Sequence, residues 1–149
     1  MKMLTMTGVG MTDEIHQLDP SICGEAIMWN ITRMMHDALN GAFGQPINRP
    51  LDVIPEMTAA QTANIDWQKV RAFNSLPFVL GLPILTLEHD VSADLTVRRI
   101  VDGNHRVTAR KRAGFVDFDT YLIPARLEGD YRVRFYSDGV EISCEEFYE

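Results

Sequence analysis

The longest helical pattern lies near the N-terminus. Apolar residues recur at helical spacing in one stretch, namely Ile27, Ile31, Met34, Met35 and Ala38. Asp19 is a favourable N-cap residue, and Pro20 suits the first position of a helix. Asn40-Gly41 is a typical helix end, because glycine commonly follows the last turn. The pattern predicts a helix from residue 19 to residue 40 with its apolar face in the core.

A second helix is predicted over residues 104–113. This segment contains good helix formers and no breaker, and Gly114 follows it as a typical residue past a helix end. We expect Val107 and Ala113 to face inward.

Three further segments have the apolar pattern of strands. They are residues 84–87, residues 96–101 and residues 116–122. In the last of them Val116, Phe118, Thr120 and Leu122 alternate with polar positions. That alternation predicts a strand with one face toward water. Residues 64–73, which precede the strands, have the spacing of a short helix with Ile65, Val70 and Phe73 as its apolar positions.

The clearest short-range pattern is a β-hairpin near the C-terminal end. Residues 131–135 and 140–144 alternate apolar and polar positions, and Asp138-Gly139 between them is a favourable two-residue turn. The predicted pairs are Phe135 with Ile142, Val133 with Cys144, and Arg132 with Glu145. The apolar members would share one face, toward the core or a subunit interface.

Other segments lack a regular pattern. Residues 1–18 have no apolar period and are expected to be irregular. Residues 41–56 contain three prolines and predict extended chain or loop. His89, flanked by Glu88 and Asp90, falls in a predicted loop and is expected at the surface.

Composition is that of one globular domain, with 149 residues, 46% hydrophobic and 23% charged. No apolar run is long enough to cross a bilayer, and the first residues do not form a signal peptide. We therefore expect a cytoplasmic protein with no membrane partner. Cys23 and Cys144 lie far apart and are expected to be buried thiols, while the four histidines show no metal-binding spacing.

Charge is distributed unevenly along the chain. The net charge of −7 disfavours a protein that coats nucleic acid through overall positive charge. Six bases nevertheless lie close together: Arg98, Arg99, Arg106, Arg110, Lys111 and Arg112. With Asp102 as the one acid among them, this segment carries +5 and leaves −12 for the remainder. A concentrated basic segment in an acidic protein indicates a local anion site.

Within this segment residues 102–106 read Asp-Gly-Asn-His-Arg, between a predicted strand and a predicted helix. Gly103 permits a tight turn, and the first N–H groups of a helix have no internal acceptor and favour an anion. His105 and Arg106 would add side-chain donors, and the guanidinium fork matches phosphate. The junction predicts a phosphate-binding site formed by Gly103, Asn104, His105 and Arg106. A glycine turn followed by a solvated basic helix is the structural alternative.

The same junction carries a family resemblance. Residues 100–109, Ile-Val-Asp-Gly-Asn-His-Arg-Val-Thr-Ala, resemble the strand–DGxHR–helix signature of the ParB/sulfiredoxin superfamily. Residues 49–54 resemble its first strand, residues 65–70 its first helix, residues 82–85 a following strand, and residues 121–125 the strand that closes the unit. These segments occur in the expected order.

The resemblance implies a small α/β (α+β) fold with a mixed sheet, in which a helix N-terminus holds nucleotide phosphates. It implies three parts: an N-terminal extension with one helix (1–45), the ParB/sulfiredoxin-like domain (46–127), and a C-terminal hairpin with an acidic tail packed on the same domain (128–149). Members of the superfamily use ATP or ADP, as sulfiredoxins and free-serine kinases do, bind CTP as partition proteins, or are described as nucleases.

Two departures narrow these implications. Sulfiredoxins carry a catalytic cysteine just before the His-Arg pair, where this chain has Asn104, so we do not expect sulfinic-acid reduction. Partition proteins continue into a helix-turn-helix domain and a dimerisation tail, so we do not expect a complete partition protein.

Two acids are candidates for catalysis. Asp102 lies beside the predicted phosphate turn, and Glu56 ends the segment that resembles the first strand. Either could hold Mg²⁺ or act as a base toward a hydroxyl, and Asp102 is the candidate metal ligand. The structural alternatives are a turn-capping role for Asp102 and a solvated surface position for Glu56.

Three functions remain open on these observations. We favour an NTP-using phosphotransferase or nucleotide hydrolase that takes ATP, ADP or CTP with Mg²⁺. The second is a ParB-like nuclease or DNA-binding protein whose DNA-backbone contacts would be Arg98, Arg99, Arg110, Lys111 and Arg112. The lack of aromatic residues within the basic segment disfavours a groove that stacks single-stranded bases. The third is a non-catalytic module that binds a protein partner or a second copy.

Overall fold

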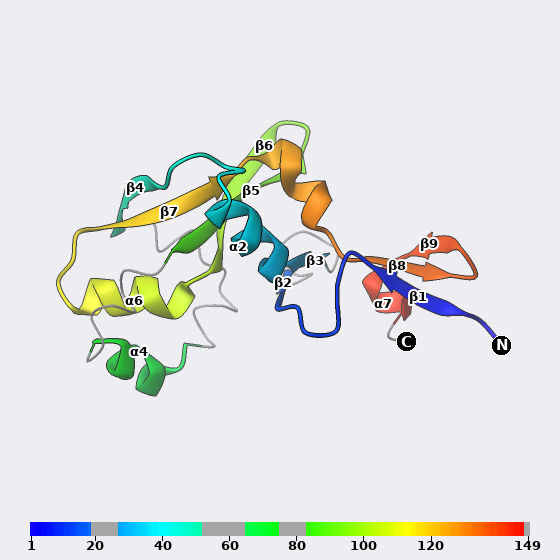
Figure 1. The fold of residues 1–149 in the computed structure, drawn as a ribbon, viewed down its shortest axis with the longest axis horizontal. Coiled ribbons are helices and arrows are strands. Elements are labelled where there is room, and N and C mark those ends of the chain that lie inside the picture. The colour runs from blue at the N-terminus through cyan, green and yellow to red at the C-terminus, as the bar shows by residue number, and fades with distance from the viewer. Residues whose placement is uncertain (19–26, 52–64, 75–82, 148–149) are drawn as a thin grey trace.

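A computed structural model describes residues 1–18, 27–51, 65–74 and 83–147. It shows a mixed α+β fold in two parts (Figure 1). The larger part contains a four-stranded sheet with helices packed on it. The smaller part contains a three-stranded sheet, in which a strand near the N-terminus pairs with one near the C-terminal end. No helix in the described ranges is long and apolar enough to cross a membrane.

The larger sheet is mixed, as predicted. Its strands are β4 (Ile47–Pro50), β7 (Asp117–Ile123), β5 (Ile84–Ser92) and β6 (Leu95–Asp102), in that spatial order. β5 and β7 are parallel, and the other neighbours are antiparallel. Parallel strands need a crossover connection. The chain therefore passes through helix α6 (Asn104–Arg112) on its way from β6 to β7.

Helix α6 and the helix before it confirm two predictions. α4 (Trp67–Asn74) lies where a short helix was expected, with Val70 fully buried. α6 ends at Arg112, with Ala113 as its C-cap just before Gly114, and Val107 is fully buried. The inward position predicted for Ala113 is wrong, because this residue caps the helix end and is exposed. Ala109 faces inward instead and packs against Val70 of α4.

The N-terminal helix is much shorter than predicted. α2 runs only from Ile31 to Leu39, because the preceding residues Ile27–Asn30 form strand β3. The helix begins at Asn30, whose Oδ1 accepts the Arg33 N–H at 3.0 Å. It ends at Asn40-Gly41 as predicted, with Gly41 at a φ of 86°. The proposed start at Asp19-Pro20 lies outside the described residues.

The first 18 residues are also more ordered than expected. β1 (Leu4–Thr7) pairs with β8 near the C-terminal end, and β2 (Ile15–Leu18) pairs with β3. The prediction of irregular structure is therefore wrong. These strands obtain their hydrogen bonds from distant segments, which a local apolar period cannot reveal.

The hairpin β5–β6 extends beyond its predicted ends. Because β5 continues to Ser92, His89 lies within a strand and is only 4% exposed. The prediction of a surface loop at His89 is therefore wrong. In β7, Phe118 and Thr120 are buried as expected, whereas Val116 precedes the strand and is exposed.

The C-terminal hairpin is confirmed near its turn and wrong farther from it. β8 (Arg134–Ser137) and β9 (Val140–Ile142) flank the predicted turn, and Phe135 pairs with Ile142. The chain then forms the short helix α7 (Cys144–Phe147), so the predicted pairs of Cys144 and Glu145 do not form. Arg132 instead forms an isolated bridge with Trp29.

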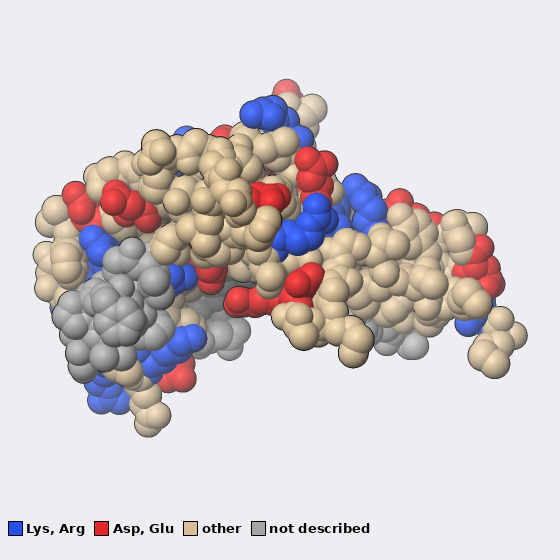
Figure 2. Space-filling view, viewed as in Figure 1, with Lys and Arg blue, Asp and Glu red and all other residues tan. Residues whose placement is uncertain are grey.

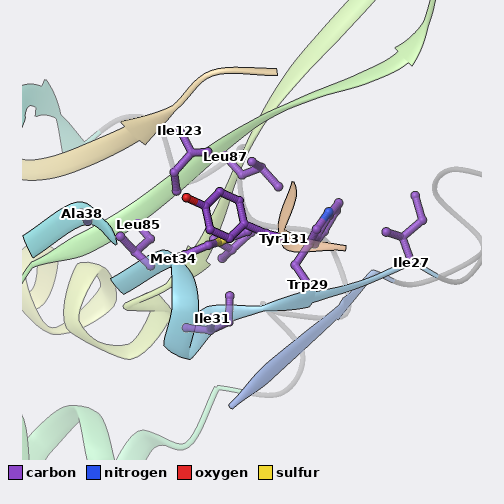
Figure 3. Packing of buried hydrophobic residues seen from close by; sticks show 10 residues of the cluster. Ile27, Trp29, Ile31, Met34, Ala38, Leu85, Leu87, Ile123 and Tyr131 are labelled. Carbon is purple, nitrogen blue, oxygen red and sulfur yellow. The ribbon is translucent and has the colours of Figure 1, made fainter. Parts of the chain in front are cut away.

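Besides the small cluster of Val70 and Ala109, three apolar clusters hold the described elements together. The first lies between α2 and the larger sheet, where the Tyr131 ring sits among Met34, Leu87 and Ile123 (Figure 3). The second lies under α6 and consists of Leu51, Ile84, Ile100, Val107 and Phe118. The third joins β3 to the smaller sheet and consists of Met28, Val133, Phe135 and Cys144, which confirms the expected inward face of the hairpin.

Strand β3 connects the two parts through the alternation of its side chains. Ile27 and Trp29 belong to the first cluster, whereas Met28 belongs to the third. Successive side chains of a strand point to opposite faces, so an apolar run can be buried on both sides. The apolar run that predicted a helix is therefore a strand that is buried on both faces.

Candidate phosphate-binding site

The predicted strand-to-helix junction is present where β6 meets α6. Gly103 is the N-cap of α6 and has a left-handed conformation with a φ of 102°. Its carbonyl oxygen accepts the Val107 N–H at 2.8 Å, which closes the first helical hydrogen bond. A Cβ at this position would lie 2.8 Å from Ile84 Cγ1 of β5. Both the backbone conformation and the close packing therefore require glycine here.

The guanidinium of Arg106 turns back over this junction. Its Nη2 lies 3.2 Å from Asp102 Oδ2 and 3.3 Å from the position that a Cβ on residue 103 would take. The Arg106 side chain is only 12% exposed. The cation is thus held at the N-terminal end of α6, beside the backbone that begins the helix.

The first turn of α6 lacks the usual acceptors. Gly103 provides no side-chain cap, and the turn contains no acidic residue. Asn104 Oδ1 is buried and has no hydrogen-bond partner among the described residues. Helix N-termini carry a partial positive charge, and the nearby guanidinium adds to it. Among the described residues, Asp102 is the acid that forms an ion pair with this guanidinium.

His105 has a structural role that was not predicted. Its Nε2 accepts the Asp66 N–H at 3.0 Å, and Asp66 Oδ1 in turn accepts the N–H groups of Gln68 and Lys69. Burial lowers the pKa of His105 from its ordinary value of 6.5, the charge of Lys69 lowers it further, and Asp66 opposes the shift. The imidazole is thus a neutral acceptor at Nε2 that fixes the start of α4, and its predicted contact with phosphate stays a prediction.

Of the two predicted acids, the structure describes only Asp102. The Asp102 carboxylate is occupied by Arg106, and Glu56 lies outside the described residues. Within the described ranges, no three residues of the types His, Cys, Asp and Glu are grouped to hold a metal ion. Any Mg²⁺ at this site would need the phosphates themselves among its ligands.

The predicted nucleic-acid contacts do not form one surface. Arg99 is only 6% exposed, whereas its neighbour Arg98 is exposed on β6. Arg110, Lys111 and Arg112 lie at the far end of α6. Figure 2 shows lysines and arginines in several separate groups, with acids between them. Arg98 and Arg99 differ in exposure because adjacent residues of a strand point to opposite faces, and the role of the five bases in nucleic-acid binding stays a prediction.

A second polar cluster, which the sequence reasoning missed, lies between β3, β5 and the 3-10 helix η2 (Ala125–Tyr131). Glu128 Oε1 accepts the Trp29 Nε1–H at 2.7 Å and two Arg132 N–H groups at 3.0 and 2.8 Å. His89 Nδ1 lies 3.7 Å from the same oxygen, and its ring meets Trp29 edge to face. The four-residue spacing of Glu128 and Arg132 was the available signal.

Comparisons of the chain with protein-family models, with curated proteins and with solved structures find no match. The resemblance to the ParB/sulfiredoxin superfamily therefore stays a prediction.

Proposed function

We propose that this protein binds a nucleotide through its phosphates at the start of α6. The observation that carries the proposal is the guanidinium of Arg106, which lies over a helix N-terminus that has no side-chain cap. A cation near the positive end of a helix is unfavourable by about 0.3–1 kcal/mol. An anion bound between the first-turn N–H groups and Arg106 would remove this repulsion.

The buried oxygen of Asn104 supports the same proposal. A buried polar atom without a partner costs about 1–3 kcal/mol, and such atoms are uncommon in folded proteins. Asn104 is the first residue of α6, so its unsatisfied oxygen belongs to the segment that we propose as the site. A hydroxyl or an ordered water that arrives with the ligand would supply the missing donor.

The ligand we propose is ATP, ADP or CTP, because a di- or triphosphate presents several oxygens to one turn of helix. Each charge-assisted hydrogen bond contributes about 1.5–3 kcal/mol. When phosphate replaces Asp102 as the partner of the Arg106 guanidinium, the Asp102 carboxylate is released from its ion pair. That carboxylate could then hold Mg²⁺ or accept a proton from an acceptor hydroxyl, which are the requirements of phosphoryl transfer or hydrolysis.

Thermal unfolding tests the binding step. A ligand at a hundredfold excess over its Kd stabilises the fold by about 2.7 kcal/mol, which raises the Tm by several degrees. We expect this shift with ATP, ADP or CTP, and we expect Arg106→Ala to abolish it. Arg98→Ala is the matched control, because Arg98 is an exposed arginine on the same strand–helix unit. No shift with any nucleotide, or an equal shift in Arg106→Ala, would overturn the proposal.

Asp102→Asn separates binding from the metal role. Without Mg²⁺, this variant should bind nucleotide more tightly, because Arg106 loses a competing anion. With Mg²⁺, the gain should disappear if the Asp102 carboxylate holds the metal. An equal gain under both conditions would show that Asp102 only competes for Arg106, and the catalytic role would then be abandoned.

A further inference from the structure

The far end of α6 combines exposed aromatic rings with basic side chains. Trp67 of α4 is 50% exposed, and Phe115, just after α6, is 45% exposed. The guanidinium of Arg112 lies over the Trp67 ring at 5.1 Å, and that of Arg110 lies over the Phe115 ring at 4.3 Å. We call Trp67, Arg110, Lys111, Arg112 and Phe115 the aromatic–basic surface.

This surface is assembled from two segments that are distant in sequence. α4 and α6 pack side by side at the end of the molecule away from the termini (Figure 1). The basic segment of α6 contains no aromatic residue of its own, but the fold supplies Trp67 from α4. The tertiary structure therefore provides an exposed aromatic ring beside the basic residues of α6, which the sequence of that segment lacks.

The charge of this region is opposite to that of the whole chain. Figure 2 shows a group of lysine and arginine side chains at the end of the molecule formed by α4 and α6. α4, which packs against α6, carries two further bases, Lys69 and Arg71. Of the nearby acids, Asp66 caps α4 through its side chain. A positive surface on a protein of net charge −7 indicates a local polyanion contact.

Helix structure alone explains only part of this arrangement. Bases in the last turn of a helix are favourable, because they complement the helix dipole. That effect does not require half-exposed aromatic rings. Single-stranded nucleic acid combines phosphates with unpaired base faces, and proteins bind it with basic grooves and aromatic platforms. A duplex hides its base faces, and an acidic peptide offers no comparable ring.

We propose that the aromatic–basic surface binds single-stranded nucleic acid, with bases stacked on Trp67 and Phe115 and phosphates held by Arg110, Lys111 and Arg112. This function is separate from nucleotide binding at the start of α6, since the two use different residues. It also needs no contribution from Arg98 or from the buried Arg99.

Fluorescence supplies a direct test, because the chain has two tryptophans in opposite environments. Trp29 is fully buried and Trp67 is half exposed, so a stacked base should quench Trp67. We expect a single-stranded oligothymidine of about twelve nucleotides, a length within the usual site size, to quench the emission. Trp67→Phe should remove this quenching but retain binding by anisotropy, whereas Trp67→Ala should weaken binding by about 5- to 150-fold.

Salt and competitors test the chemistry of the partner. Affinity should fall with rising salt, and Lys111→Ala should lower the logarithmic slope by about 0.7 while Arg98→Ala leaves it unchanged. Equal or tighter binding of a duplex with the same sequence would overturn the proposal. So would equal competition by polyglutamate, which would show that charge alone is recognised.

A crossed pair of variants keeps the two proposals distinguishable. Arg106→Ala should abolish the thermal response to nucleotides and leave oligonucleotide binding unchanged. Trp67→Ala should do the reverse, with circular dichroism used to check that it remains folded. If Arg106→Ala weakens oligonucleotide binding as much as Trp67→Ala does, the strand is held at the start of α6 and the aromatic–basic surface is not its site.

Discussion

Two groups of polar side chains differ in how completely their hydrogen bonds are satisfied. Between β3, β5 and η2, one oxygen of Glu128 serves both the Trp29 indole and the Arg132 guanidinium. At the start of α6, Asn104 Oδ1 is buried without a partner among the described residues, and no side chain caps the helix. The first group joins three elements of the fold and is called the joint below, and the second is the place where we propose that phosphate binds.

This difference matters because each buried polar atom that lacks a hydrogen-bond partner lowers the stability of the fold. A satisfied network holds its elements in one arrangement, whereas an unsatisfied one lowers stability until a ligand completes it. Charge alone does not distinguish the two groups, because each contains an arginine–carboxylate pair four residues apart. The two groups differ in the polar atoms beside each pair, which are hydrogen-bonded in the first group and lack a partner in the second.

The largest effect is expected at the joint. Glu128→Ala would leave the Trp29 N–H and a partly buried Arg132 without their acceptor, at a cost of about 3 kcal/mol of unfolding free energy. Urea denaturation measures this loss. The control is Glu141→Ala, whose pair with Arg134 is exposed and should contribute less than about 1 kcal/mol. Equal losses in the two variants would contradict a structural role for the joint.

The next effect concerns the backbone at the start of α6. Gly103→Ala combines an unfavourable positive φ with a contact against Ile84, so we expect a loss of about 2–3 kcal/mol. Gly114→Ala, at the other end of the same helix, also has a positive φ but nothing within 4 Å. It should lose about 1 kcal/mol from strain alone. If the two variants unfold at the same denaturant concentration, the close packing of residue 103 on β5 adds nothing to the loss of stability.

Acid should weaken both groups, because each contains a histidine with a depressed pKa. Burial is the first cause for His89, with Arg99 and Arg132 lowering the pKa further and Glu128 and Asp90 opposing the shift. For His89 and His105 alike, the stabilisation is complete above the ordinary pKa of 6.5 and is lost as the pH falls through the folded value. Urea denaturation at pH 7 and pH 5 should show this decrease.

Single substitutions assign that pH dependence to each group. His89→Gln and His105→Gln should each flatten the change in unfolding free energy between pH 7 and pH 5, and the double variant should flatten it most. Asp13 and Asp37 do not contribute to this window, because their pKa values lie below the ordinary 3.8. A slope unchanged in both single variants would show that neither imidazole is neutral in the fold.

The smallest loss of stability is expected at Asn104. Since its buried oxygen makes no hydrogen bond, Asn104→Ala should cause no loss of unfolding free energy and should raise it by up to about 1–3 kcal/mol, the cost of the unsatisfied oxygen. Urea denaturation of this variant completes the comparison with Glu128→Ala. A loss above about 2 kcal/mol would mean that Asn104 has a structural partner, and the contrast between the two groups would fail.

Local signals in the sequence predicted the elements that depend on local interactions. The breaker-free segment before Gly114 gave α6, and Asp138-Gly139 gave the turn between β8 and β9. The junction at Gly103 was predictable for the same reason, because a strand, a glycine and a helix follow one another directly. The orientation of Arg106 over the junction depends on Asp102, only four residues away.

Features that depend on distant contacts were missed. β1 and β2 are short strands whose partners lie elsewhere in the chain, and β3 was taken for helix because burial on both faces hides the strand period. The hydrogen bond that His105 accepts from a residue 39 positions away was likewise not predicted. The aromatic–basic surface could not be predicted from α6 alone, since Trp67 comes from another helix.

The pairing of β1 with β8 has a consequence for biosynthesis. Leu4 lies opposite Ser137, so the first strand leaves the ribosome long before its partner exists. At about 5–20 residues per second, the delay is on the order of ten seconds. During that interval Leu4 and Met6 have no sheet to join, whereas β5, β6 and α6 can already assemble. The smaller sheet is therefore expected to be the last part of the nascent chain to fold, and a chaperone that shields the N-terminal segment would act before that step.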